Sequence, residues 1–192
     1  MILVTGSNGF VGRQIVKSLI NIGKDVKLVV RNESVVNFKT MEHVDIIYTE
    51  NLFNQDSKWW DGVLVDVDVV IHAAWFMEPG KYLQSEKNID CLNGTVNLAR
   101  ACIRANIKKF IGIGTCFEYD LDCGVLSTKT PLVPRSMYAT CKVSTYLLLN
   151  NLFKLNNIKF AWCRLFYLYG DGENKKRLVP YIRSQIKKGQ VL

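Results

Sequence analysis

The chain has 192 residues, of which 48% are hydrophobic, and a formal net charge of +8. This length and hydrophobic content are sufficient for one domain with a full core. The sequence has no run of about 18 apolar residues, and its N-terminus has no charged region followed by an apolar one. We therefore expect neither a transmembrane helix nor a signal peptide.

The basic and sulfur-containing residues suggest no special chemistry. Lys and Arg are dispersed, with no long basic run or nucleic-acid motif, so we interpret the surplus charge as a solvated surface. The six cysteines form no C-x-x-C pair and have no His at ligand spacing. We expect free thiols in a reducing cytoplasm, no metal site, and neither nucleic acid nor a membrane as a partner.

A glycine-rich turn lies at the start of the chain. A short apolar run at 2–4 is typical of a strand, and Gly6, Gly9 and Gly12 follow at intervals of three. From Phe10 onward the apolar residues are spaced for one face of a helix. This strand–turn–helix context predicts a nucleotide site, because glycine lets a pyrophosphate approach and the helix N-terminus attracts its charge. The alternative is a βα turn without a ligand. The expected site comprises Gly6, Asn8, Gly9, Phe10, Val11 and Gly12.

Residues 25–30 read as a second strand, which ends at Val30 and is followed by Arg31. In dinucleotide-binding folds an acidic residue at this place binds the ribose 2′-hydroxyl of NAD, whereas an Arg can bind the 2′-phosphate of NADP. The pattern favours NADP(H) over NAD(H), with a plain surface Arg as the alternative.

The next segments continue the alternation of strands and helices. Residues 44–48 form a third apolar run, and the segment 51–61 contains Trp59-Trp60, which we expect on a helix packed against the sheet with one ring buried. Residues 67–74 are almost continuously apolar, as in a central parallel strand. Ala73 and Ala74 leave room at the end of that strand, and His72 is expected to be a packed strand residue.

The second half has the same organisation. A loop at 75–81, a helix at 82–105, a strand at 109–115, a loop at 120–134, a helix at 136–155, a strand at 159–168, a turn at 169–172 and a helix at 178–188 follow in order. This alternation predicts an α/β fold with a doubly wound parallel sheet.

Three side chains are candidates for acid–base chemistry. Tyr138 and Lys142 are four residues apart, so they share one helix face. A nearby ammonium favours the phenolate and would lower the pKa of Tyr138, which then exchanges a proton with a carbonyl or alcohol. Thr115, at the end of the fifth strand, could hold the same oxygen, or could simply bond to the backbone.

The pattern as a whole resembles the extended short-chain dehydrogenase/reductases, the superfamily of nucleotide-sugar epimerases and dehydratases. The resemblance is carried by Thr-Gly-x-x-Gly-x-x-Gly at 5–12, His-Ala-Ala at 72–74, the helix segment 88–97, the trio Thr115, Tyr138 and Lys142, the segment 164–170 and Leu-Val-Pro-Tyr at 178–181. Tyr167 stands where an Asn is common in the family.

The resemblance implies roles for individual residues. Tyr138 would be the acid–base residue, Lys142 would bind the nicotinamide ribose and Thr115 would orient the substrate oxygen. Cofactor contacts would also include His72, Ala73, Ala74, Asn88 and Phe166, and Arg31 at the adenosine end.

The two residues that directly follow Thr115 help to identify the reaction. Relatives that remove water carry Asp-Glu there, whereas this chain has Cys116 and Phe117, so we expect no 4,6-dehydratase. The resemblance favours NADPH-dependent reduction of a 4-keto-6-deoxy sugar on a nucleoside diphosphate. A 4-epimerase and a non-catalytic dinucleotide-binding module stay as alternatives.

The resemblance also bears on domain organisation. Residues 1–192 would form a Rossmann-like NAD(P)-binding domain, with a substrate-binding region starting at about 170 and the C-terminal substrate lobe mostly absent. Family members commonly dimerise through a four-helix bundle, for which the helices at 82–105 and 136–155 are available.

Overall fold

The computed structural model describes residues 1–31, 42–174 and 177–189. The strands are β1 (Ile2–Thr5), β2 (Val26–Val30), β3 (Val44–Tyr48), β4 (Val69–His72), β5 (Lys109–Thr115) and β6 (Lys159–Leu165). The α-helices are α1 (Phe10–Asn21), α2 (Ser57–Val63), α3 (Lys87–Arg104), α4 (Met137–Leu155) and α5 (Leu178–Lys187). Short 3₁₀ turns are η2 (Leu52–Asn54), η3 (Tyr82–Gln84), η4 (Cys116–Glu118) and η5 (Leu121–Cys123).

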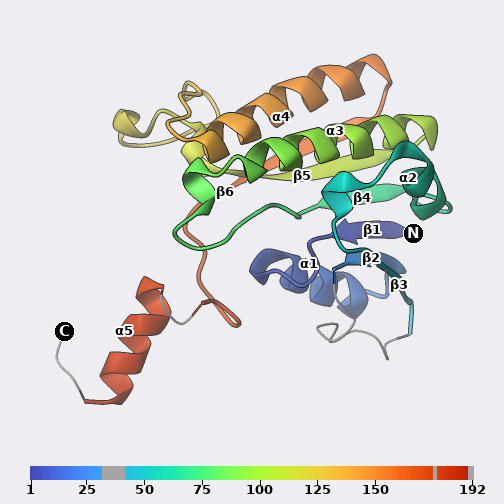
Figure 1. Ribbon diagram of the computed structural model, residues 1–192. Helices are drawn as coiled ribbons and strands as arrows, with labels where there is room; N and C mark the ends of the chain where they lie inside the picture. The colour runs from blue at the N-terminus through green and yellow to red at the C-terminus, as the bar shows by residue number, and fades with distance from the viewer. Residues whose placement is uncertain (32–41, 175–176, 190–192) are drawn as a thin grey trace.

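The six strands form one parallel sheet in the order β3-β2-β1-β4-β5-β6. This is the doubly wound order, in which the direction of winding reverses between β1 and β4. The carboxyl ends of all the strands lie on one side of the molecule (Figure 1). The predicted fold class is therefore confirmed, and the topology places a ligand crevice at that edge.

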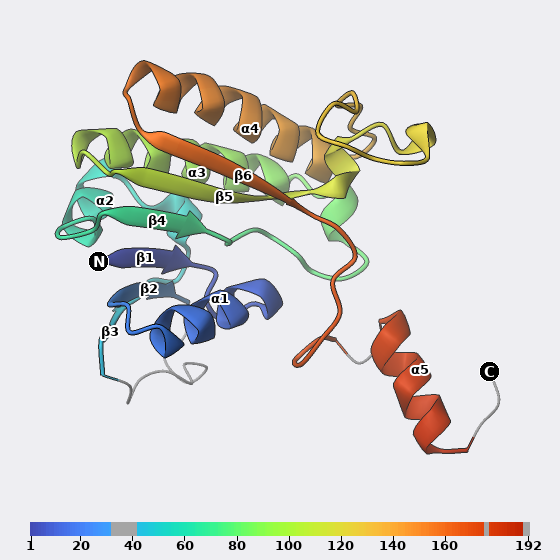
Figure 2. The ribbon, with the colours of Figure 1, turned by 180° about the vertical axis from the view of Figure 1, so that it is seen from behind.

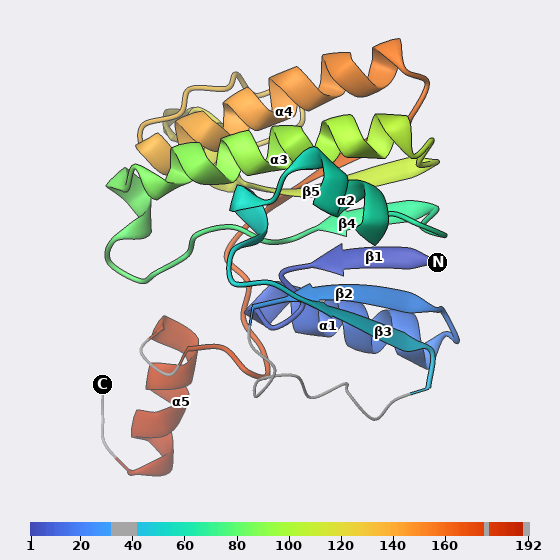
Figure 3. The same ribbon diagram turned by 45° about the vertical axis from the view of Figure 1, so that its right-hand side comes forward.

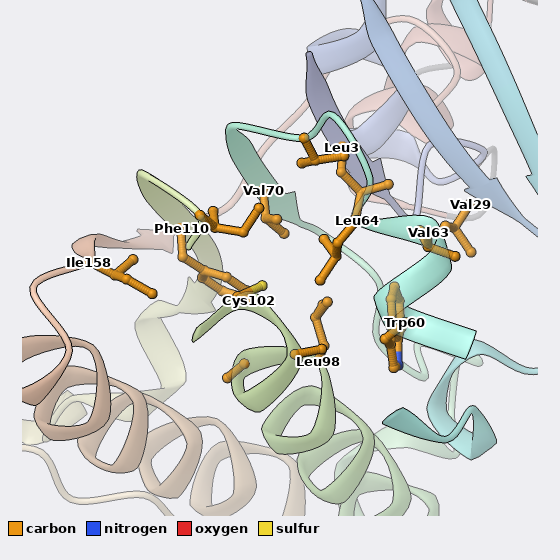
Figure 4. Close-up of a cluster of buried hydrophobic side chains, with 14 of the residues drawn as sticks. Leu3, Val29, Trp60, Val63, Leu64, Val70, Leu98, Cys102, Phe110 and Ile158 are labelled. Atoms are coloured by element: carbon orange, nitrogen blue, oxygen red, sulfur yellow. The ribbon is translucent and has the colours of Figure 1, made fainter. Parts of the chain in front are cut away.

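The helices divide between the two faces of the sheet. Helices α2, α3 and α4 cover one face and α1 covers the other (Figures 1 and 3). On the three-helix side, Trp60, Leu98 and Phe110 are buried in one cluster, which Figure 4 shows. Of the tryptophan pair, Trp60 is fully buried and Trp59 only partly, so the prediction of one buried ring is confirmed.

Several predicted boundaries differ from the structure. The apolar run at 67–74 forms only the short strand β4, and the strand expected at 159–168 ends at Leu165. The helix expected at 82–105 is divided into η3 and α3, because the backbone at Ser85 is extended and its carbonyl accepts hydrogen bonds from Asn88.

The chain leaves the sheet after β6. Helix α5 lies apart from the sheet in every view (Figures 2 and 3). Before it, the loop returns to α1, where Gln14 donates a hydrogen bond to the Asp171 carbonyl over 3.1 Å and Arg13 lies against Gly172. This loop therefore contacts the helix that starts at the glycine turn.

Candidate functional site

The glycine turn between β1 and α1 is built by close backbone contacts. Gly6 has a φ of 73°, and a Cβ on it would meet the Ala74 amide nitrogen at 2.6 Å. A Cβ on Gly12 would overlap the Gly6 carbonyl. The turn is thus packed against the residues that follow β4, and side chains at these two positions would force it apart.

The N-terminus of α1 is open to an anion. Its N-cap residue, Gly9, makes no side-chain capping bond, and no acidic residue occurs in the first turn. The first amide groups of a helix have no partner within the helix, so those of Phe10, Val11 and Gly12 are available together with the positive end of the helix dipole. Asn8 lies beside them, and its carbonyl accepts a long bond of 3.4 Å from Arg13.

Ser7 is a residue that the sequence reasoning missed. Its side chain is 0% exposed, and its hydroxyl has no hydrogen-bond partner among the described residues. A buried polar atom without a partner is rare and costly. Located within the glycine turn, it fits the phosphate oxygen acceptors of a dinucleotide. This orphaned hydroxyl and the uncapped helix show that the turn suits a pyrophosphate.

His72 is enclosed at the end of β4. Its Nδ1 lies 2.8 Å from the Thr5 hydroxyl and its Nε2 lies 2.9 Å from the Thr95 hydroxyl. Because Thr95 gives its hydroxyl proton to the Cys91 carbonyl over 2.6 Å, Nε2 carries the ring proton and Nδ1 accepts from Thr5. Burial lowers the pKa of His72 to about 3, so the ring is neutral. The structure places its side chain in the packing with α3, as the apolar run predicted.

Ala73 and Ala74 continue from β4 next to the glycine turn. The Ala73 amide donates to the Thr5 carbonyl over 3.2 Å, and Ala74 is the residue that approaches Gly6. The methyl side chains of these two residues occupy little space at this edge of the sheet. The carboxyl ends of the adjacent strands β1 and β4 therefore pack directly against each other.

Asn88 is buried in the first turn of α3 and uses its whole side-chain amide. Its nitrogen donates to the carbonyls of Tyr82 (2.7 Å) and Ser85 (2.8 Å), and its oxygen accepts from the Trp75 indole at 2.8 Å. It therefore fixes η3 and the Trp75 loop around the site. The structure gives it this organising role, and its predicted contact with a cofactor stays a prediction.

Thr115 and Tyr138 meet at the carboxyl end of β5. The Thr115 hydroxyl accepts a 3.3 Å bond from the Phe117 amide, and Thr115 lies near enough to Tyr138 to influence the pKa of its phenol. Both readings of Thr115, as a backbone cap and as a partner of the tyrosine, are compatible with this geometry. Burial raises the pKa of Tyr138, and the neighbouring Thr115 works in the opposite direction.

Lys142 lies one turn further along α4 and is buried. Its Nζ donates to the Ile113 carbonyl over 2.7 Å and lies 3.8 Å from the centre of the Trp75 ring. Burial lowers the pKa of Lys142 to about 7, although the Glu118 carboxylate works against that shift. Trp75 also packs edge-on against Tyr138, with ring centres 6.4 Å apart. The loop after β4 thus joins the candidate acid–base pair to the glycine turn.

Two predicted cofactor residues lie at the margins of this arrangement. Arg31 directly follows β2 and is exposed. Phe166 follows β6 and is 50% exposed, while its neighbour Tyr167 lies edge-on to Phe117 with ring centres 6.2 Å apart. Their predicted contacts with a cofactor stay predictions.

Across the described ranges, no helix is long and apolar enough to cross a membrane. In the same part of the chain, no group of three or more His, Cys, Asp or Glu side chains has a geometry that could hold a metal ion.

The fold and the site define a class of protein: a doubly wound, Rossmann-like domain with a Thr–Tyr–Lys group at the carboxyl edge of its sheet. The model of the NAD dependent epimerase/dehydratase family matches residues 2–192, and the chain belongs to that family.

Individual relatives are similar over nearly the whole chain. The chain is 29% identical over 204 aligned residues to ADP-L-glycero-D-manno-heptose-6-epimerase of Brachyspira hyodysenteriae, covering 99% of this chain and 63% of the relative. It is 24% identical to dTDP-6-deoxy-L-talose 4-dehydrogenase (NAD(+)) of Aggregatibacter actinomycetemcomitans, covering 88% and 62%.

Among solved structures, UDP-N-acetylglucosamine 4-epimerase from Methanobrevibacter ruminantium, in complex with UDP-N-acetylmuramic acid, has a TM-score of 0.83 and 26% identity, and the match covers 98% of this chain and 63% of that one. The chain thus spans less than two thirds of the length of these relatives.

Proposed function

We propose that this chain is the cofactor-binding part of an oxidoreductase that reduces the 4-keto group of a nucleoside-diphosphate-linked 4-keto-6-deoxy sugar. The observation that carries the proposal is the convergence of Thr115, Tyr138 and Lys142 beside the glycine turn, at the one edge of the sheet where a bound dinucleotide would lie. When bound, a nicotinamide supplies the hydride for such a reduction.

The chain's own residues would handle the proton. Because burial raises the pKa of Tyr138, the phenol is protonated at neutral pH and can donate to the carbonyl oxygen as that oxygen gains negative charge. The Thr115 hydroxyl would hold the same oxygen. Lys142 would supply positive charge to the tyrosine as its proton leaves.

Two features bear on the choice of reaction and cofactor. Cys116 and Phe117, which follow Thr115, have no carboxylate for eliminating water. Arg31, exposed directly after β2, could pair with a 2′-phosphate and supports NADP(H). The relative from Aggregatibacter, which is named for NAD(+), leaves NAD(H) as the alternative.

A nucleotide-sugar 4-epimerase is the second candidate, and the 26% identity to the Methanobrevibacter 4-epimerase favours it. Such an enzyme would need Tyr138 both to take and to return a proton. The two candidates differ in stoichiometry, because a reductase consumes one reduced cofactor per sugar and an epimerase consumes none.

The test is to assay this chain with NADPH and with NADH against nucleotide-linked 4-keto sugars and their 4-epimers, together with Tyr138→Phe. We expect stoichiometric oxidation of NADPH that falls at least 100-fold in the variant. Interconversion of epimers without net oxidation would establish the epimerase instead. If Tyr138→Phe retained full activity, the proposed mechanism would be wrong. Cofactor binding without turnover of any sugar would favour the non-catalytic module.

We also propose a homodimer through α3 and α4. The two helices pack side by side (Figure 1), and α4 presents Leu147, Leu148 and Leu155 to solvent, the last with 81% exposure. Sedimentation of wild type and of Leu148→Glu tests the proposal, which predicts a dimer that the variant dissociates. A monomeric wild type at micromolar concentration would refute it.

A further inference from the structure

A buried carboxylate that the proposed chemistry does not use lies directly behind Thr115. The Glu118 side chain is 0% exposed at the end of η4. One oxygen accepts the Thr115 backbone amide proton over 2.8 Å. In return, the Thr115 hydroxyl caps the same turn through the Phe117 amide. These reciprocal bonds form a capping box, which fixes both the backbone and the side-chain rotamer of Thr115.

The remaining hydrogen bonds of Glu118 come from β6. The Trp162 indole nitrogen lies 3.0 Å from both carboxylate oxygens, and the Arg164 Nε donates to one of them over 2.6 Å. The Arg164 guanidinium is in turn held between two rings, 5.0 Å from the centre of Tyr119 and 4.4 Å from that of Tyr146. The carboxylate is therefore neutralised and fully hydrogen-bonded, as a buried charge requires.

The sheet is shaped to admit this group. On the face of β5 that meets α4, two positions are Gly112 and Gly114, and a Cβ on either would collide with the Trp162 ring. A Cβ on Gly114 would also lie 2.5 Å from the Glu118 carboxylate. Because both residues are glycines, there is room for the Trp162 indole and the Glu118 carboxylate on this face of the strand. An apolar residue at 118 would leave the Thr115 amide buried without a partner.

The group formed by Glu118, Trp162 and Arg164 also lies close to Lys142. Trp162 approaches the Lys142 ammonium, with 5.7 Å from Nζ to the ring centre. The titratable groups whose charges act on Lys142 or are acted on by it are Glu118 after β5, Cys91 on α3 and His72 on β4. Among them, Glu118 is the carboxylate, so it favours the ammonium form of Lys142.

We infer that Glu118, held by Arg164 and Trp162, is a positioning residue that fixes the backbone and hydroxyl of Thr115 at the carboxyl end of β5. The significance of this role for catalysis rests on the proposed function, whereas the role itself is a property of the folded chain. Glu118 acts through Thr115 and need not touch a substrate.

The first test measures by NMR the ratio of the amide hydrogen-exchange rate of Thr115 to that of Ile111 in the same strand. In Glu118→Val we expect the ratio to rise about 10-fold or more, because the Thr115 amide loses its acceptor. Glu118→Gln keeps one carbonyl oxygen and should restore most of the protection. Arg164→Lys, which weakens the hold on the carboxylate without removing it, gives an intermediate ratio and serves if Glu118→Val does not fold.

A matched control is Lys27→Met. Lys27 is also buried, donates to the carbonyls of Val63 and Val65 over 3.2 and 2.8 Å, and lies on β2, away from β5. Its loss should leave the Thr115 ratio unchanged. An unchanged ratio in folded Glu118→Val, or an equal rise in Lys27→Met, would overturn the inference, since the effect would then be absent or a general loss of stability.

Two further readouts separate positioning from packing. The pKa of Lys142, followed through its side-chain resonances, should fall in both Glu118 variants, because each removes the negative charge. If the wild type reduces a sugar, kcat should fall by about 10- to 100-fold in Glu118→Val, with cofactor affinity within about threefold. A folded wild type that binds cofactor but turns over no sugar would favour the non-catalytic module over the proposed function, and the exchange ratio would still decide this inference.

Discussion

The loss of folding stability at acid pH that results from His72 gives a quantitative test of the packing around this side chain. The neutral ring accepts from Thr5 and donates to Thr95, so a second ring proton has no acceptor in this arrangement. The pKa falls from 6.5 in the unfolded chain to about 3 in the folded one. Between these values the unfolded state binds more protons, so the contribution of His72 to stability is full above about pH 6.5 and is lost as the pH falls toward 3.

The magnitude follows from the two pKa values. One unit of pKa difference corresponds to about 1.4 kcal/mol, so lowering the pH from 7.5 to 4.5 should remove about 3 kcal/mol of unfolding free energy through His72. His72→Gln keeps one acceptor and one donor for the two threonines but does not titrate. The difference in unfolding free energy between wild type and variant should therefore change by about 3 kcal/mol across this range.

The assay is urea denaturation at four pH values between 4.5 and 7.5, with the unfolding free energy of both proteins extrapolated to water. Comparing the change with pH, rather than the absolute values, removes the intrinsic cost of the substitution and the carboxylates common to both proteins. Parallel pH profiles for wild type and variant would refute the reasoning, because His72 would then titrate equally in both states.

Two more predictions concern the residues around Tyr138. The pKa of buried Lys142 is about 7 when folded and 10.5 when unfolded, so the unfolding free energy of the wild type relative to Lys142→Met should rise by about 2 kcal/mol from pH 7 to 9 in chemical denaturation. A difference between the two proteins that does not change with pH would contradict the depressed pKa. Trp75→Phe loses the indole bond to Asn88 but keeps a ring over Lys142, and should cost about 1 kcal/mol of unfolding free energy. Trp75→Leu, measured in the same way, should cost more, and an equal cost in both variants would argue against the cation–π contact.

Most of the fold is predictable from local pattern. The apolar runs, the glycine turn and the helical spacing around Tyr138 specify a parallel doubly wound sheet, because each reports a period or a backbone requirement within a few residues. Strand ends were predicted less well, since the apolar character at 67–74 continues past β4 into Ala73 and Ala74, which leave the sheet. Apolar character alone does not say where pairing stops.

The supporting residues of the site had no such local signal. Glu118 and Trp162 are 44 residues apart, and only the pairing of β5 with β6 brings them together. Gly112 and Gly114 were visible in the sequence, and their alternation was a hint that a large side chain crosses that face of the strand. The expectation that Lys142 lowers the pKa of Tyr138 is wrong for the folded chain, because burial raises the pKa of the phenol and the opposing influence comes from Thr115.

The measurement that tests the central claim most directly is a fluorescence titration of wild type and Gly12→Ala with NADPH and, in parallel, NADH. A Cβ at Gly12 would overlap the Gly6 carbonyl and open the turn. We predict saturable binding by the wild type, tighter for NADPH, and affinity at least about 10-fold weaker in the variant. Equal affinity for both cofactors would contradict only the interpretation of Arg31. A folded wild type that binds neither cofactor, or a variant that binds as tightly as the wild type, would contradict the assignment of the glycine turn as a dinucleotide site.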